Sequence, residues 1–371
     1  MSKDLLKALA LLDGLTEDSE GEEINIEDNI QGDSEEKGES KSKDLSILSI
    51  DDARRLLALK GGFGKAKFTR KITEAIINPN NNISAEVGCD DVINLVSDYS
   101  SLGDQYSALK ICDHFLKIFP YNADLLSYGV LCATHSGQFD KGQKYIDALN
   151  EMKIENWTWR AFLYTAIYYK EKATNCSSSE IANFRKKGIE VCHNYQKILP
   201  FDERGYNQEA EILLDSNKIN EAIDILKNVI FNSIVINGEN VKIKAPQCCA
   251  TLLSIIKNGT DYDLIIKTSM KGILYTTQDQ PSVKIGYFTY LIALAKDALI
   301  TENEYNNKAE IQDALSYYQC AYDLNRDRSY AKTIEIRYAI LSQNPKNPIT
   351  DKPLLKRELV CDVDDLSDNG E

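Results

Sequence analysis

Apolar side chains recur at helical spacing along most of this chain. Between residues 88 and 343, segments of helix length with apolar residues at i, i+3 and i+4 alternate with short polar turns, a pattern typical of amphipathic α-helices. One stretch differs, because "IVINGENVKIKAP" (234–246) places Asn-Gly between two apolar runs and so resembles a β-hairpin. The pattern as a whole predicts an all-α protein.

The two ends of the chain follow other patterns. Residues 1–15 predict a short amphipathic helix, because Leu5, Leu9 and their apolar neighbours share one face. Residues 16–47 are charged, rich in Gly and Ser and free of aromatic side chains. Such a segment buries too little apolar area to offset its ordering entropy, so we expect a disordered acidic linker. We expect residues 344–371 to form an acidic, flexible tail.

Residues 48–87 predict a short helix, capped by Ser49, that is followed by a basic linker. The stretch "GGFGKAKFTRK" in this linker suggests a phosphate-binding loop, but it lacks the GxxxxGK[ST] spacing and no predicted strand precedes it. We expect instead a flexible segment whose lysines and arginines face an acidic partner or the chain's own acidic linker.

The helical pattern repeats. In "LVSDYSSLGDQYSALKICDHFLKIFPYN" (95–122), Tyr99, Gly103 and Ala108 follow one another at short intervals. A step of about 34 residues leads from Gly103 to Gly137 and from Ala108 to another small residue, Gly142. A small residue lets two helices approach closely, an aromatic ring fills the space between hairpins, and Gly permits the positive φ of a sharp turn.

Further units follow with weaker matches. "NWTWRAFLYTAIYY" (156–169) has its aromatic side chains at the spacing of a first helix, and a later unit has Asn217 where the turn Gly stands. Asn tolerates a left-handed backbone better than most residues, so this replacement is mild. Two more units, near Gly259 and Ala314, keep only part of the pattern.

These residues resemble the tetratricopeptide repeat (TPR) family, in proteins of bacterial type. The resemblance covers residues 88–343 and implies a right-handed α-solenoid of about six antiparallel helix hairpins, with disordered acidic N- and C-terminal tails. It also implies that ligands lie along a concave groove formed by the first helix of each hairpin. By register, the partner-binding groove would contain Ser97, Ser100, Ser127, Leu131, Phe162, Thr165, Tyr169, Asn207 and Glu211.

One ligand class of that family is not expected. Its chaperone-binding members hold a terminal carboxylate with Lys and Asn on the first helix. The matching positions are Ile93 and Ser97 in the first unit and Ser127 and Leu131 in the second. The resemblance therefore does not extend to a chaperone-tail receptor.

The sequence offers no pattern of catalytic or metal-binding residues. The nine cysteines form no CxxC pair, and the three histidines have no Cys, Asp or Glu at persuasive ligand spacing. GxSxG and HExxH are also missing from the sequence. We therefore expect no enzyme activity, no cofactor and no metal, and we expect reduced, buried cysteines in a cytoplasmic protein.

Charge and hydropathy restrict the partners. The net charge of −14 argues against general attraction to nucleic-acid phosphates or anionic lipid. No apolar run approaches the roughly 18 residues of a membrane span. The first apolar run is followed by an acidic tract rather than by small residues, which argues against a signal peptide.

These observations predict a scaffold or adaptor that binds a peptide or protein partner in its groove. The alternative is a peptide-responsive regulatory sensor, which changes conformation to capture or release a partner protein. The aromatic side chains of 156–169 have two open interpretations, packing between repeats or anchors in the groove. The helix predicted in 1–15 can dock on another protein or on this chain's own groove as a self-inhibitory plug.

Overall fold

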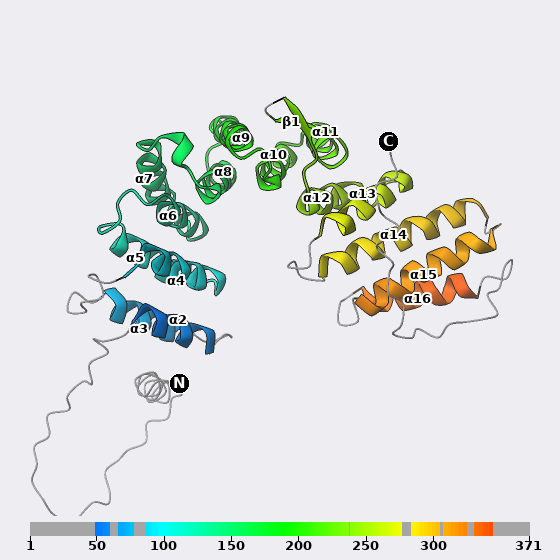
Figure 1. The fold of residues 1–371 in the computed structure, drawn as a ribbon, viewed down its shortest axis with the longest axis horizontal. Helices are drawn as coiled ribbons and strands as arrows, with labels where there is room; N and C mark the ends of the chain where they lie inside the picture. Colours follow the sequence, from blue (N-terminus) through cyan, green and yellow to red (C-terminus); the bar gives the residue numbers. More distant parts are fainter. Residues whose placement is uncertain are drawn as a thin grey trace, which may run out of the picture. The chain divides into compact units, whose positions relative to one another are not determined.

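The computed structural model describes residues 49–59, 66–77, 87–236, 238–276, 283–304, 307–324 and 330–343. The predictions for 1–15, 16–47 and 344–371 lie outside these ranges. Contacts divide the chain into two units, the first ending at Gly188 and the second beginning at Ile189, within one long helix. Each unit consists of consecutive antiparallel helices (Figure 1).

The first unit contains paired helices in chain order. They are α2 (Ile50–Leu59) and α3 (Ala66–Ile77), α4 (Cys89–Ser101) and α5 (Gln105–Phe115), α6 (Ala123–His135) and α7 (Phe139–Asn150), then a 3₁₀ turn η3 (Ile154–Asn156), α8 (Trp159–Thr174) and the start of α9 (Ile181–Ile198).

The second unit continues the series and adds one strand pair. It holds the rest of α9, α10 (Glu203–Asp215) and α11 (Ile219–Phe231), β1 (Ile234–Ile236) and β2 (Glu239–Val241), α12 (Pro246–Ile256) and α13 (Tyr262–Tyr275), α14 (Val283–Glu302) and α15 (Lys308–Leu324), and finally α16 (Ala331–Ser342).

The turns within hairpins have the backbone that the sequence predicts. Gly103 has φ of 79°, Gly137 has φ of 71° and Asn217 has φ of 59°, and each joins the two helices of one hairpin. In this left-handed region Gly has no steric penalty and Asn has a small one. Side chains then cap the first turn of the next helix. At the start of α5, for example, the Asp104 side chain accepts from the backbone N–H of Ser107.

Close contacts between small residues and rings join the helices of the first unit. The first helices α4, α6 and α8 pack in sequence, as do the second helices α3 and α5. A Cβ at Gly142 of α7 would lie 2.8 Å from Cε2 of Tyr168 on α8, and the Tyr168 hydroxyl donates to the carbonyl of Phe139 at 3.0 Å. The small residue and the ring therefore hold successive hairpins together, as the sequence predicts.

The second unit has the same kind of contact. A Cβ at Gly272 of α13 would lie 2.6 Å from Cε2 of Phe288 on α14. Its helices also pack in order, α10 and α11 on α12, α13 on α14, and α15 on α16. The expected β-hairpin is confirmed, because β1 and β2 pair antiparallel with Ile234 opposite Val241, and Gly238 in the turn has φ of 85°.

The predicted all-α fold of stacked hairpins is confirmed in both units. In the described part of 88–343, α4 to α15 form the six expected hairpins, and α16 follows them.

The prediction of a basic linker after α2 is wrong for residues 66–77, which form α3. Thr69, Ile72 and Ile76 make a buried stripe on this helix, and the Tyr99 hydroxyl of α4 donates to the carbonyl of Thr69. The basic residues between these positions hid the stripe in the sequence.

Candidate interaction surface

The predicted groove residues divide by burial. Ser97 and Ser100 on α4 are partly exposed. The side chains that the structure buries are Ser127, Leu131, Phe162, Thr165 and Tyr169. Because a buried side chain cannot line a groove, this corrects the prediction for those five residues. Asn207 and Glu211 are partly exposed, lie on α10 of the second unit, and are joined by a hydrogen bond of 3.1 Å.

The start of α8 explains why the predicted register of this helix is wrong. The sequence pattern places Trp157 in the helix, but Trp157 lies before it, and its indole Nε1 donates to the carbonyl of Leu149 at 3.0 Å. Thr158 is the N-cap and accepts from the backbone N–H of Ala161. Counted from that cap, Phe162 faces the interior, with its ring 5.2 Å from that of Trp157. The face left accessible contains Tyr164, which the sequence pattern places at the spacing of a first helix, and Arg160, which it does not single out.

Five residues of α6 and α8 form a cluster around the Arg160 guanidinium. We call this set, Asp124, Tyr128, Trp159, Arg160 and Tyr164, the arginine–aromatic cluster. The guanidinium lies 4.5 Å from the ring centre of Trp159 and 5.7 Å from that of Tyr128. The rings of Tyr128 and Tyr164 are 5.6 Å apart, and those of Trp159 and Tyr164 are 6.1 Å apart. Such cation–π and ring contacts hold the side chains in one arrangement.

Asp124 fixes the position of the cluster. One of its carboxylate oxygens accepts from the Thr158 hydroxyl at 2.6 Å, and the other accepts from Arg160 Nη1 at 3.3 Å. The first contact ties the N-cap of α8 to α6. The second is long for a hydrogen bond to a charged group, and it engages only one nitrogen of the guanidinium fork.

Arg160 and Tyr164 keep one charge state across the ordinary pH range. Burial alone would lower the pKa of Arg160, but Asp124 and the nearby tyrosine oppose this effect and raise it. The pKa of Tyr164 is raised, mainly by burial and then by Tyr128, so its phenol stays neutral. The Arg160 side chain is 27% exposed, while its Nε is buried without a hydrogen-bond partner in the described residues.

This arrangement suits recognition more than chemistry. A charged, partly exposed guanidinium between aromatic rings can donate hydrogen bonds to a carboxylate or stack on a planar group. Trp, Tyr and Arg are the side chains that most often dominate binding energy at protein interfaces. The signal for this cluster in the sequence was Thr158, because an N-cap residue sets the register of the helical turn that follows it.

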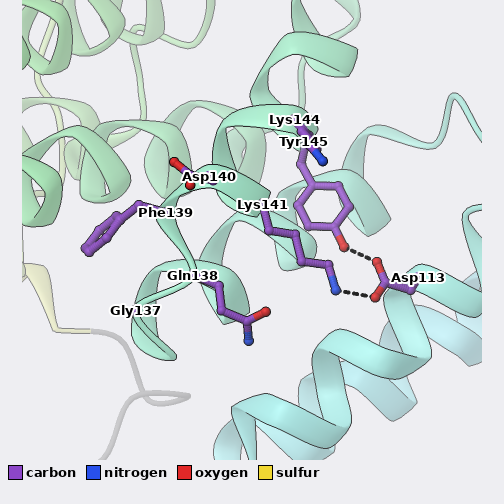
Figure 2. Close-up of a pocket in the computed structure, with 8 residues that line it drawn as sticks. All are labelled: Asp113, Gly137, Gln138, Phe139, Asp140, Lys141, Lys144 and Tyr145. Atoms are coloured by element: carbon purple, nitrogen blue, oxygen red, sulfur yellow. Dashed lines mark hydrogen bonds and ion pairs between the residues drawn. The ribbon is translucent and has the colours of Figure 1, made fainter.

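A second concavity lies on the other helices of this unit. A cavity of about 670 Å³ lies between α5 and α7 and is lined by Asp113, Gly137, Gln138, Phe139, Asp140, Lys141, Lys144 and Tyr145 (Figure 2). Asp113 accepts from both the Lys141 ammonium and the Tyr145 hydroxyl. The pKa of Tyr145 is raised by burial and then by Asp113, so the phenol remains a donor. These contacts use the side chains of the cavity to join α5 to α7.

Groups of possible chemical reactivity are mostly buried. Burial raises the pKa of the Cys112 and Cys192 thiols well above the ordinary value, which keeps them protonated and unreactive. Seven cysteines are free thiols, but Cys320 is disulfide-bonded, so the expectation of reduced cysteines is wrong for Cys320. In the part of the chain that the structure describes, no three His, Cys, Asp or Glu side chains gather to hold a metal ion. Nor is any described helix apolar and long enough to cross a membrane.

Comparison with known proteins finds a likeness among solved structures. No family model matches the chain, and no curated protein matches it. Among solved structures, a thermophilic TPR protein in Thermus thermophilus is similar with a TM-score of 0.37 and 11% sequence identity, over 68% of this chain and 97% of that chain.

Proposed function

We propose that this protein is a non-catalytic interaction module, a scaffold or adaptor, that binds a protein or peptide segment across α4, α6 and α8. The arginine–aromatic cluster is the anchor of this surface. The observation that carries the proposal is the partly exposed Arg160 guanidinium, which lies between the rings of Trp159 and Tyr128 and has only one nitrogen bonded to Asp124.

Preorganisation supports this assignment. Asp124 and Trp159 already restrict the Arg160 side chain, so binding costs less rotamer entropy than it would for a freely moving arginine. On α4, which packs against α6, Ser97 and Ser100 offer partly exposed hydroxyl groups. A rigid aromatic and arginine centre with adaptable polar neighbours is the usual composition of a binding hot spot.

The chemistry of the cluster defines the partner's anchoring group. The partly exposed guanidinium of Arg160 favours a carboxylate, and the partly exposed ring of Trp159 favours a planar side chain. We therefore expect binding segments to contain Asp or Glu near an aromatic residue. Nucleic acid is disfavoured, because the chain has a net charge of −14.

The test selects binding peptides from a displayed peptide library, with the full chain as the target. The affinity of the chain for each selected peptide is then measured. Both tryptophans of the chain, Trp157 and Trp159, are near the surface in question. A Trp157→Phe variant leaves Trp159 as the only indole, so binding at the cluster should change its fluorescence. We expect Trp159→Ala and Arg160→Ala each to weaken binding by at least about tenfold, as for a hot-spot residue.

Tyr121→Ala is the matched control, because this exposed aromatic residue lies in the loop before α6, outside the cluster. Its binding should equal that of the unaltered chain. Equal binding by the Arg160→Ala variant, or failure to select any peptide that changes Trp159 fluorescence, would show that the cluster is not a binding surface. A check of thermal unfolding separates lost binding from lost folding.

A further inference from the structure

The end of α8 and the start of α9 carry an excess of positive charge. The segment 170–187 contains five basic side chains and two acidic ones, although the chain as a whole has a net charge of −14. A local excess of one sign creates a surface potential that attracts groups of the opposite sign. The basic residues of this segment are Lys170, Lys172, Arg185, Lys186 and Lys187.

Two of these lysines share one aromatic ring. The ammonium nitrogens of Lys172 and Lys187 lie 5.1 Å and 5.8 Å from the ring centre of Phe184 on α9. The Lys172 ammonium also donates to the Tyr168 hydroxyl at 3.0 Å, and the Lys187 nitrogen lies 5.8 Å from the ring centre of Tyr169. We call these five residues the lysine–aromatic patch.

The described residues hold the two lysines without neutralising them. Their contacts are with rings and a neutral phenol, and neither ammonium has a carboxylate of the described residues within ion-pair distance. Two like charges beside one ring repel each other, and a bound anion replaces this repulsion with attraction. Lys187 is exposed, and Lys172 and Phe184 are partly exposed, so an anion can reach both ammonium groups from solvent.

The rings of the patch favour carboxylates over nucleic acid. The ring of Phe184 already stacks on that of Tyr169, with centres 6.4 Å apart and planes at 20°, and Tyr169 is buried. These rings therefore offer no stacking platform for a base, which single-stranded nucleic acid uses. A long phosphate backbone also meets the net charge of −14, whereas a short run of Asp or Glu brings only a few charges to the patch.

We propose that the lysine–aromatic patch is a second interaction surface, which binds an acidic segment of a partner protein through carboxylates placed at Lys172 and Lys187. The patch lies twelve residues along α8 from Arg160, a distance of about 18 Å on the helix axis. It also includes side chains of α9, which are absent from the arginine–aromatic cluster. Binding at the patch therefore does not depend on the cluster.

Fluorescence polarisation of a labelled hexaglutamate peptide tests the proposal. The full chain with Arg160→Ala is the starting protein, so that the cluster cannot hold the peptide. Adding Lys172→Gln and Lys187→Gln should weaken binding on the order of tenfold, because two ion pairs are lost. The matched control adds Lys117→Gln and Lys153→Gln instead. It removes the same charge from two exposed lysines of the same unit and should change the affinity less than about twofold at physiological salt.

Three outcomes would overturn the proposal. Equal weakening in the two double variants would show that net charge alone attracts the peptide. Absence of hexaglutamate binding would show that the patch holds no acidic segment. Tighter binding of a single-stranded DNA of six thymidines would identify nucleic acid as the partner.

The single variant Lys187→Gln keeps the test valid if the double variant unfolds at a lower temperature. The Lys187 side chain is exposed and contacts only ring faces among the described residues, so this variant should keep the unfolding temperature of the starting protein. It should still weaken hexaglutamate binding on the order of threefold. Unchanged binding in a folded Lys187→Gln variant would contradict the role of this lysine.

Discussion

In the first unit, the contacts between hairpins are made by rings on small residues and by hydrogen bonds near the surface. Tyr168 lies against Gly142, and Asp113 joins α5 to α7 through Lys141 and Tyr145, with its side chain 40% exposed. In the second unit the ring contact returns at Gly272, but the end of the unit is joined by a buried ion. Asp297 of α14 is 2% exposed and accepts from the Tyr318 hydroxyl at 2.8 Å and from Arg337 at 2.7 and 2.9 Å.

The difference shows where each unit depends on precise chemistry. A contact between a ring and a small residue tolerates other apolar pairs of similar volume. A buried carboxylate does not, because each of its hydrogen bonds offsets part of a desolvation cost of several kcal/mol. The buried ion joins α14, α15 and α16 in one network, so we expect the second unit to be the more sensitive to a single substitution.

The substitution with the largest expected effect removes the buried carboxylate of that network. Asp297→Ala should lower the free energy of unfolding of the second unit by about 3 kcal/mol, because it leaves Arg337 and Tyr318 without their shared acceptor. Urea unfolding followed by far-UV circular dichroism measures the loss. Both tryptophans lie in the first unit, so fluorescence reports that unit separately.

The matched control is Asp313→Ala, which removes a more exposed carboxylate paired with Lys296 and should cost less than about 1 kcal/mol. If both variants lost the same free energy of unfolding, burial of Asp297 would add nothing to the stability that its carboxylate provides. A parallel shift of the tryptophan transition would mean that the two units unfold together, and the comparison would no longer hold.

The shared ring contact gives the next effect. Gly142→Ala and Gly272→Ala each bring a Cβ within 2.8 Å of a ring carbon. Overpacking costs typically about 1–3 kcal/mol, and the helix preference of Ala over Gly returns about 1 kcal/mol. The free energy of unfolding of each variant should therefore fall by up to about 2 kcal/mol. Tryptophan fluorescence measures the loss for Gly142→Ala, and circular dichroism measures it for Gly272→Ala. A variant with a higher free energy of unfolding would show that successive hairpins can move apart to make room for the Cβ without losing stability.

The smallest effect depends on pH and concerns the second unit. Asp202 caps α10 and accepts from Arg204 and from the Tyr195 hydroxyl. Burial would raise the pKa of Asp202, but these hydrogen bonds outweigh it and lower the pKa below 3.8. A lowered folded-state pKa stabilises the fold above the unfolded pKa of about 3.9, and this contribution is lost as the pH falls through the folded value.

Asp202→Asn keeps the cap but removes the titration. The difference in urea midpoint between the unaltered chain and this variant should therefore be present at pH 6 and shrink as the pH falls below about 4. Asp261→Asn makes the same change at the N-cap of α13, where the carboxylate accepts from the backbone N–H of Leu264, and serves as the control. A difference that grows on acidification would contradict the sign of the shift.

Much of the fold was readable in the sequence, and little of the candidate surface was. Turn glycines, Asn217 and the Asn-Gly hairpin carry local signals, because their backbone conformations are open to few residue types. Helix α3 was missed because basic side chains interrupt its stripe of Thr and Ile. The register of α8 was missed because Trp157 reads as a helix residue until its indole is seen to bond the carbonyl of Leu149.

The sequence by itself determined that the chain folds into paired helices with sharp, glycine-dependent turns, since propensity and periodicity act over a few neighbouring residues. The tertiary structure alone decided which faces of those helices are buried. That choice placed Phe162 inside and Arg160 at the surface, and it brought Asp297 to Arg337 across 40 residues of sequence. Burial depends on contacts between distant segments, which no local pattern contains.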